Sequence, residues 1–295
     1  MRVLDDAFVR EHLTPERAIA WLREVVLALE GKTYQAPPRV EVPLLDGKVV
    51  YTAGARTGRW YGYRSYDKVA GAEELVVAYD AASGRALGLA AGTELGPRRV
   101  GAMTALAVDA LAPAGAATLG LLGAGRQAWA QLWAIRAVRH LDRVRVYARD
   151  PERREAFTRR ARAELGLTVE AAASARGAVE GAGLVVLATS SLTPVIEASW
   201  VDESPFVASI GPKQVGASEF GPDLVTRAGR IVTDSLAQLD AYHPAHVAAV
   251  HPRRGEISAL GPALSAGPAT GVTLFLSVGL AGTEVALLAR LLELP

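Results

Sequence analysis

The feature that most constrains this chain is a glycine-rich turn between a short apolar run and an amphipathic segment. Residues 119–122 read LGLL, as a buried parallel strand requires, and residues 123–128 read GAGRQA, a G-x-G-x-x-A pattern. Apolar residues then recur every three or four positions up to Val138, and a second apolar run covers 144–147. The order of strand, glycine turn, helix and strand predicts a β-α-β unit of the kind that binds a dinucleotide.

Each small residue of the turn has its own expected role. We expect Gly123 to make the tight turn, Gly125 to let the backbone approach a pyrophosphate, and Ala128 to let the helix pack closely against the strand. The N-terminus of the helix supplies N–H groups for the phosphates. The residues expected to bind the cofactor lie in this turn and at the ends of later strands: Gly123, Ala124, Gly125, Arg126, Gln127, Ala148, Arg149, Asp150, Thr189, Gly211 and Ser277.

The end of the second strand bears on the choice of cofactor. Tyr147 is followed by Ala148 and Arg149, and the first carboxylate is Asp150. An arginine beside the ribose suits a 2′-phosphate, because its fork bonds a phosphate bidentately. NADP(H) is therefore favoured over NAD(H). The alternative is that Arg149 is a surface residue and that Asp150 bonds the ribose hydroxyls.

Length and composition limit the class of protein. The 295 residues suffice for about two domains. A balance of 32 basic against 31 acidic residues argues against a nucleic-acid or membrane partner held by bulk charge. The chain has no cysteine, and the histidines of segment 243–251 match no metal motif, so we expect neither a disulfide nor a metal site. The charged N-terminus and the lack of a membrane-length apolar run indicate a cytoplasmic protein.

The remaining chain divides into two kinds of pattern. After residue 150, short apolar runs alternate with helical or loop segments, which is typical of a doubly wound parallel sheet. Residues 39–80 instead contain β-forming runs separated by turn signals. The predicted fold class is α/β, with a Rossmann-type parallel sheet domain, a smaller β-rich α+β domain and a hinge at 113–115.

Several separated motifs together resemble one family, the ornithine cyclodeaminase/μ-crystallin family of NAD(P)-dependent amino- and imino-acid enzymes. The order and spacing of these motifs match over nearly the entire chain. The motifs are Pro38-Arg39-Val40, Tyr61-Gly62-Tyr63-Arg64, Thr93-Glu94, Arg99 opening a helix that ends Leu111-Ala112-Pro113, the GAGRQA turn, Thr273-Leu274-Phe275 and Ser277-Val278-Gly279.

This resemblance implies a domain organisation and an assembly. Residues 1–113 and 280–295 would form a substrate-binding and dimerisation domain, and residues 114–279 an inserted dinucleotide-binding domain. It also implies a homodimer and a small amino or imino acid as substrate.

The family's substrate site can be carried over residue by residue. Its two carboxylate-binding arginines fall on Arg39 and Arg99. The family lysine after the Tyr-Gly-aromatic triplet is replaced by Arg64, and the aspartate that engages the reacting amine aligns with Lys213. Arg64 and Lys213 are the candidate catalytic residues, with Arg64 also supporting the substrate carboxylate. The cyclodeaminase glutamate for the distal amine has no counterpart in segment 49–51.

These departures favour imine chemistry over cyclodeamination. The four cations Arg39, Arg64, Arg99 and Lys213 would repel a diamine such as ornithine by several kcal/mol at an effective dielectric constant of about 20. Lys213 is the expected proton donor if its surroundings lower its pKa, because a guanidinium stays protonated. We therefore expect hydride transfer between NADP(H) and the α-carbon of a small α-imino or α-amino acid, as in a ketimine or pyrroline-2-carboxylate reductase. The alternatives are an ornithine cyclodeaminase, an alanine dehydrogenase-type enzyme and a μ-crystallin-like binding protein with little turnover.

Overall fold

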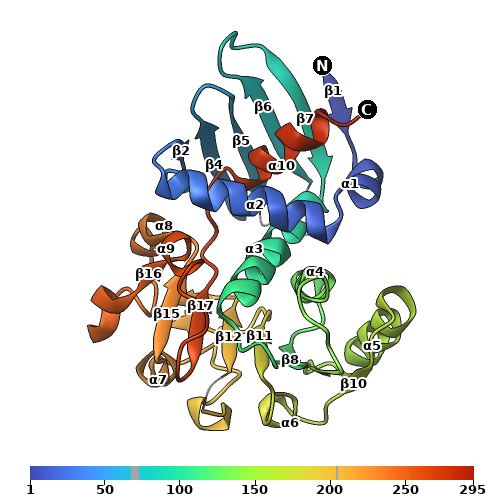
Figure 1. The fold of residues 1–295 in the computed structure, drawn as a ribbon, viewed down its shortest axis with the longest axis vertical. Helices are drawn as coiled ribbons and strands as arrows, with labels where there is room; N and C mark the ends of the chain where they lie inside the picture. Colours follow the sequence, from blue (N-terminus) through green and yellow to red (C-terminus); the bar gives the residue numbers. More distant parts are fainter. Residues whose placement is uncertain (68–72, 204) are drawn as a thin grey trace. The chain divides into compact units, whose positions relative to one another are not determined.

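The chain divides into two compact units. The computed structural model describes residues 1–67, 73–203 and 205–295 (Figure 1). The first unit contains residues 1–102 and 279–295, and the second contains residues 103–278. This division falls inside α3 (Leu95–Leu111). The domain bounds 1–113 with 280–295 and 114–279, with a hinge at 113–115, stay a prediction.

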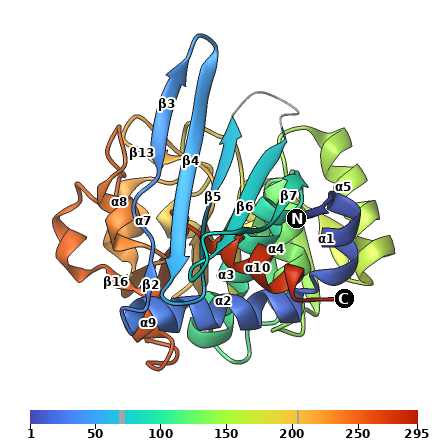
Figure 2. The same cartoon turned by 90° about the horizontal axis from the view of Figure 1, so that it is seen from above.

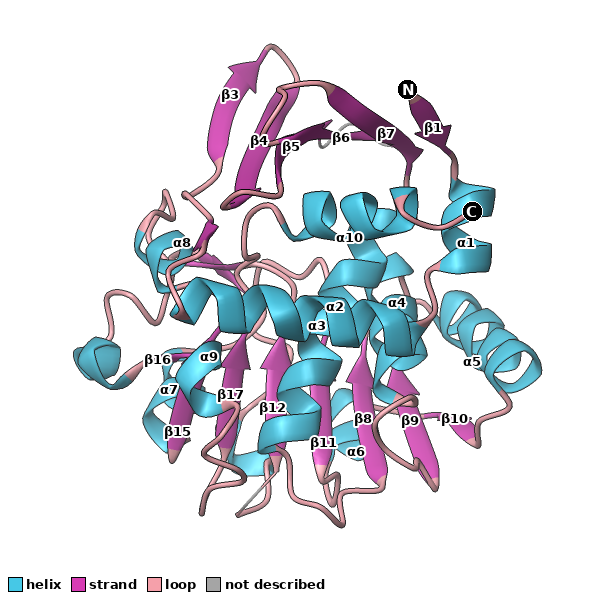
Figure 3. Cartoon of the chain, turned by 45° about the horizontal axis from the view of Figure 1, so that its top comes forward, coloured by secondary structure: helices cyan, strands magenta, loops and turns pink. Residues whose placement is uncertain are grey.

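The second unit contains an eight-stranded parallel sheet, and its strands point the same way in Figure 3. The strand order is β10-β9-β8-β11-β12-β17-β15-β16. The order reverses between β8 and β11, which in doubly wound sheets is the place where ligands bind. The predicted α/β class with a Rossmann-type sheet is thus confirmed. The strands are β8 (Thr118–Leu122), β9 (Arg143–Tyr147), β10 (Val169–Ala171), β11 (Leu184–Leu187), β12 (Phe206–Ser209), β15 (Arg230–Thr233), β16 (Ser258–Ala259) and β17 (Thr273–Leu276).

The sequence patterns of this unit follow from burial. Strands β11, β12 and β17 are buried along their whole length, which explains their uninterrupted apolar runs. Helix α4 ends at Ile135 and not at Val138, because the chain turns away over the next residues. The other elements are α4 (Arg126–Ile135), α5 (Pro151–Leu165), α6 (Ala175–Val179), α7 (Pro222–Arg227), α8 (Leu236–Asp240), α9 (Leu260–Ala263), the 3₁₀ helices η1 (Ala198–Trp200) and η2 (Pro252–Glu256), and the hairpin of β13 (Lys213–Gln214) and β14 (Ala217–Ser218).

The first unit is built on a seven-stranded sheet in the order β1-β7-β6-β5-β4-β2, with β3 paired to β4. Its strands pair antiparallel except for β1 with β7, and β3 and β4 extend as a long hairpin in Figure 2. The elements are β1 (Arg2–Leu4), α1 (Asp6–His12), α2 (Pro15–Glu30), β2 (Tyr34–Gln35), β3 (Val40–Leu44), β4 (Gly47–Arg56), β5 (Trp60–Asp67), β6 (Glu74–Asp80), β7 (Ala86–Gly92) and α10 (Thr283–Leu292).

Glycines let the C-terminal helix α10 lie directly on this sheet. A Cβ atom on Gly62 would approach Cγ1 of Val285 to 2.7 Å, and one on Gly88 would approach Cδ2 of Leu292 to 2.6 Å. Both approaches are too close for a side chain, so the missing Cβ atoms set the depth of packing. This contact brings the two ends of the chain into one unit. Among the described residues, no helix combines the length and apolar character needed to cross a membrane.

Candidate cofactor and substrate sites

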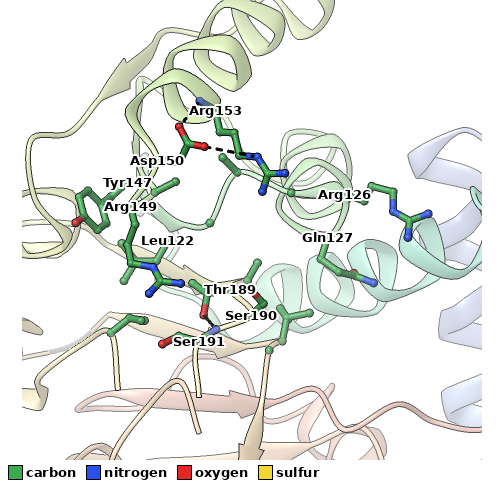
Figure 4. Close-up of a pocket in the computed structure, with 18 residues that line it drawn as sticks. Leu122, Arg126, Gln127, Tyr147, Arg149, Asp150, Arg153, Thr189, Ser190 and Ser191 are labelled. Atoms are coloured by element: carbon green, nitrogen blue, oxygen red, sulfur yellow. Dashed lines mark hydrogen bonds and ion pairs between the residues drawn. The ribbon is translucent and has the colours of Figure 1, made fainter. Parts of the chain in front are cut away.

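A cavity of about 430 Å³ lies in the second unit, at the carboxyl ends of β8, β9, β11 and β12 (Figure 4). Every residue expected to bind the cofactor lines this cavity except Ser277. Ser277 instead donates its hydroxyl to Oδ2 of Asp234 at 3.4 Å, and both residues are buried. The further lining residues, which the sequence did not single out for the cofactor, are Leu122, Tyr147, Arg153, Ala188, Ser190, Ser191, Val195 and Ile210.

The two glycines of the turn have different surroundings. Gly123 has φ of +119°, and its N–H donates to the carbonyl of Tyr147 at 2.8 Å. A Cβ atom on Gly123 would lie 2.3 Å from the carbonyl oxygen of Ala188. Gly125 caps α4 with an extended backbone, and a Cβ atom there would meet nothing within 4 Å. Gly123 is therefore required by the protein itself, whereas Gly125 leaves room in front of the helix.

Two arginines line the cavity near the end of β9, and Arg149 lies across from Gln127 in Figure 4. Arg149 is exposed and lines the cavity, and so does Arg153, which belongs to the first turn of α5. Oδ1 of Asp150 accepts the backbone N–H groups of Glu152 and Arg153 at 3.0 and 3.1 Å. Asp150 therefore serves as the N-cap of α5, a role that sequence analysis did not assign to it.

A buried carboxylate, Glu219, ties together the strand ends beneath the cavity. Its Oε2 accepts the N–H of Thr189 at 3.0 Å, and its Oε1 accepts the N–H of Gly211 at 2.6 Å. Oε1 also accepts the hydroxyl of Ser209 at 2.8 Å and the N–H of Ile210 at 3.1 Å. Glu219 therefore fixes the backbone of three residues that line the cavity, Thr189, Ile210 and Gly211. Sequence reasoning missed it, because nothing in the local pattern distinguishes it from a surface glutamate.

Lys213 and His246 are buried together in the second unit. The ammonium of Lys213 donates to the carbonyl of Gly211 at 2.5 Å. Nδ1 of His246 accepts the N–H of Ala248 at 2.9 Å, and burial together with the charge of Lys213 lowers the pKa of His246 to about 3. His246 is therefore neutral at working pH. Within the described residues, no group of three or more potential ligands is placed to hold a metal ion.

Arg39 belongs to the first unit and precedes β3 directly. Its Nε donates to Oε1 of Glu41 at 3.0 Å, and Lys48 pairs with the same carboxylate. The side chain of Arg39 is 21% exposed. The arginine is thus held at the start of the long hairpin by a neighbouring acid.

Arg64 and Arg99 lie together in the first unit and share one carboxylate. Oε1 of the buried Glu284 lies 2.8 Å from Nη1 of Arg64 and 2.6 Å from Nε of Arg99. Glu74 binds Arg64 from the other side, at 2.8 Å. The sequence-based count of four cations was therefore incomplete, because carboxylates offset three of them: Glu41 pairs with Arg39, Glu74 with Arg64, and Glu284 with both Arg64 and Arg99. The sequence held one signal for Glu284: it is the only charged residue between Val272 and Leu288.

Known proteins resemble this chain in both sequence and fold. Residues 19–293 match the ornithine cyclodeaminase/mu-crystallin family. The iminosuccinate reductase of Paracoccus denitrificans is 31% identical over 250 residues, which cover 82% of this chain and 76% of that protein. The crystal structure of that reductase with NAD⁺ superposes with a TM-score of 0.89 at 26% identity, over 99% of this chain and 95% of the other. An archaeal alanine dehydrogenase dimer with bound NAD shares the fold, with a TM-score of 0.88 at 22% identity over 99% of this chain and 94% of the other.

Other relatives match over less of their length. The chain spans about half the length of two further curated relatives, 51% of one and 54% of the other. The family match nevertheless extends from residue 19 to residue 293, across both units. The chain therefore belongs to the ornithine cyclodeaminase/mu-crystallin family.

Proposed function

We propose that this protein is an NAD(P)H-dependent oxidoreductase that reduces the C=N bond of a small α-imino acid. In this reaction a bound reduced nicotinamide would supply a hydride to the α-carbon and a proton would be added to the nitrogen, which would yield an α-amino acid and NAD(P)⁺. The observation that carries this proposal is the cavity of the second unit, with its glycine turn at the N-terminus of α4. Membership of the family and the similarity to an imino acid reductase support the same class of reaction.

The residues of the cavity fit a nicotinamide dinucleotide. Gly125 leaves open space before α4, and as the N-cap it has no side chain to bond the first N–H groups of that helix. Oε1 of Gln127 is buried without a hydrogen-bond partner in the described part of the chain, so it offers an acceptor to a ligand. When bound, the nicotinamide supplies the hydride. The turn and the strand ends would bind and orient it.

The charges at the rim support NADP(H) as the preferred cofactor. Arg149 and Arg153 both line the cavity, and a 2′-phosphate is the ligand group that arginine forks bind best. An NAD-specific site uses an acid at this position to bond the ribose hydroxyls. The only nearby acid among the lining residues, Asp150, already accepts two backbone N–H groups with one oxygen.

Substrate roles are proposed for two arginines and one lysine at the family's positions. Arg39 and Arg99 are proposed to orient the carboxylate. Lys213 is proposed as the proton donor, directly or through a water that it holds, because its ammonium is fixed on Gly211, a residue that lines the cavity. Correct orientation of the reacting groups is one of the main contributions that a protein makes in such a reaction.

Ornithine cyclodeaminase is a second candidate for one structural reason. Glu74 and Glu284 offset the charges of Arg64 and Arg99, so a diamine is repelled less strongly than the sequence indicated. Both carboxylates are already engaged by guanidinium groups, and for this reason we favour the imine reductase. A binding protein with little turnover is the third candidate.

We also infer a homodimer formed through the outer face of the first unit's sheet. Large apolar side chains stand exposed on neighbouring strands of this face, among them Tyr51, Tyr61 and Tyr63 at 43%, 40% and 36%. Tyr61 stacks on Tyr79 of the neighbouring strand with ring centroids 5.1 Å apart, which extends the aromatic surface of this face. An exposed apolar face of this kind is typical of a surface that another protein covers.

Steady-state assays separate the candidate functions. Oxidation of NAD(P)H with pyrroline-2-carboxylate, piperideine-2-carboxylate or iminosuccinate supports the reductase. Ammonia release from ornithine with formation of proline identifies a cyclodeaminase. Tight binding of NADPH without turnover of any of these compounds identifies a binding protein.

A further inference from the structure

The carboxylate of Glu284 is fully buried in the first turn of α10. Its Oε1 accepts from Nη1 of Arg64 at 2.8 Å and from Nε of Arg99 at 2.6 Å. The hydroxyl of Thr283 donates to the carbonyl of Leu280 at 2.8 Å and lies 3.2 Å from Oε2 of Glu284. Burial by itself raises the pKa of Glu284, but Arg99 and Arg64 reverse this effect and bring the pKa below its usual range. The start of a helix also favours a negative charge. Glu284 is therefore an ionised carboxylate that joins α10 to both arginines.

The guanidinium group of Arg64 is taken up by protein carboxylates. Its Nε and Nη2 bind Glu74 at 3.1 and 2.8 Å, and its Nη1 binds Glu284. Its planar face lies over the ring of Tyr66, 3.9 Å from the ring centroid. Each nitrogen of this guanidinium thus has an acid beside it, which leaves little of the group for a ligand.

Arg99 is bound differently. Its Nε meets Glu284, but its Nη1 is buried and has no acceptor in the part of the chain that the structure describes. Arg99 as a whole is 7% exposed. The Nη edge lies beside Gly279, where a Cβ atom would stand 3.5 and 3.7 Å from the two Nη atoms. A buried guanidinium nitrogen without an acceptor is costly, so Nη1 points to an anion supplied from outside the protein.

We propose that Glu284 is a positioning residue: it holds Arg99 by Nε so that the Nη1 edge is presented to the substrate carboxylate, while Arg64 supports Glu284 without contacting the substrate. This inference rests on the proposed function and narrows it, because it assigns the carboxylate contact to Arg99 and removes it from Arg64. It also explains why an arginine is accommodated at position 64. Arg64 pairs with both Glu74 and Glu284, and with Arg99 it forms a cluster of two cations and two anions.

Two substitutions at one position separate positioning from simple charge balance. Glu284→Gln keeps the length of the side chain and an acceptor oxygen but removes the charge. Glu284→Asp keeps the charge but withdraws the oxygens by one methylene. Glu24→Gln is the matched control, because Glu24 also binds an arginine, Arg290 of α10, at 2.6 Å but lies at the surface. For each protein, pyrrole-2-carboxylate, a planar carboxylate that accepts no hydride, is titrated into the NADPH-loaded enzyme, and KM and kcat are measured with an imino acid.

Positioning predicts that both Glu284 variants bind the carboxylate roughly tenfold or more weakly, since hydrogen bonds to charged groups are of that strength. KM rises by a similar factor while kcat falls less, and the Kd for NADPH stays within about twofold of the wild-type value. All these constants of the control Glu24→Gln stay within about twofold of the wild-type values. If Glu284 only balances charge, Glu284→Gln binds the carboxylate more tightly and Glu284→Asp behaves as wild type, which overturns the inference. If Glu284→Gln does not fold, Glu284→Asp alone decides. If the wild-type protein binds the carboxylate but turns over no imino acid, only the proposed function is wrong, because the titration still decides the role of Glu284. If the wild-type protein binds no carboxylate, the inference is wrong.

Discussion

A Cβ atom on Gly123 would lie 2.3 Å from the carbonyl oxygen of Ala188, and these two residues follow the neighbouring parallel strands β8 and β11. At Gly123, therefore, the space where a side chain would stand is occupied by the protein backbone and not by a ligand. Gly125, the second glycine of the motif, has open space where its side chain would stand. One glycine is needed for the fold, and the other is available to a ligand.

Substitution of these two glycines by alanine is expected to give opposite results. Gly123→Ala combines a backbone overlap with φ of +119°, so we expect a loss of roughly 2–5 kcal/mol in the free energy of unfolding. Gly125→Ala meets no atom of the protein, so stability should change by about 1 kcal/mol or less, while the Kd for the cofactor rises roughly tenfold or more. Urea titrations and NADPH fluorescence measure the two quantities. Normal cofactor binding by Gly125→Ala would contradict the assignment of the cavity.

Arg149→Ala tests the choice of cofactor. Loss of an arginine beside the 2′-phosphate should weaken NADPH roughly tenfold and leave NADH nearly unchanged. Arg143→Ala is the control, because Arg143 begins β9, the strand that Arg149 follows, but is a surface residue paired with Glu170 and does not line the cavity. Equal weakening of the two cofactors in Arg149→Ala would remove the argument for NADP(H).

Arg99→Ala tests the substrate carboxylate. Without this guanidinium, KM for the imino acid should rise roughly tenfold to hundredfold, because a charge-assisted bond to the carboxylate is lost. The Kd for NADPH should stay at the wild-type value, since the cavity belongs to the second unit and Arg99 to the first. An unchanged KM would show that the substrate binds elsewhere.

His246 should make the stability of the protein depend on pH. Burial and the charge of Lys213 lower the pKa of His246 from 6.5 to about 3, so the folded protein keeps the ring neutral where the unfolded chain protonates it. The unfolded state then binds more protons, and stability is lost as the pH falls from 6.5 toward 3, by at most about 1.4 kcal/mol per pH unit. His246→Asn retains an acceptor for the N–H of Ala248 and lacks this titration. Urea titrations at several pH values should show a shallower loss for the variant; parallel curves would refute the prediction.

The sheet face of the first unit offers a test of assembly. Tyr63→Glu places a charge among exposed apolar side chains and should convert a dimer to a monomer in light scattering after size exclusion. Leu27→Glu is the control, because Leu27 is 53% exposed on α2 of the same unit, away from the sheet. A wild-type monomer, or dissociation by Leu27→Glu as well, would contradict the proposed interface.

The local parts of the site were predictable from the sequence, and the parts built from distant segments were not. The strand, the glycine turn and the start of α4 all follow from patterns within residues 118–135, and the expected cofactor residues other than Ser277 line one cavity. Glu284 meets Arg64 across 220 positions of sequence and Arg99 across 185. No local pattern encodes such a pairing, so the sequence alone overstated the net positive charge around Arg64 and Arg99. Glu219 was missed for the same reason, because the strand ends that it joins meet only in the folded sheet.

Imine reduction is tested most directly by following the transferred hydride. Wild-type protein is incubated with NADPH that carries deuterium at the transferable position and with an α-imino acid, and the amino acid formed is examined by mass spectrometry. If the protein is an imine reductase, the product carries one deuterium on its α-carbon, and one NADPH is consumed for each molecule formed. A product without deuterium, or NADPH that remains bound and unoxidised with every imino acid, would contradict it.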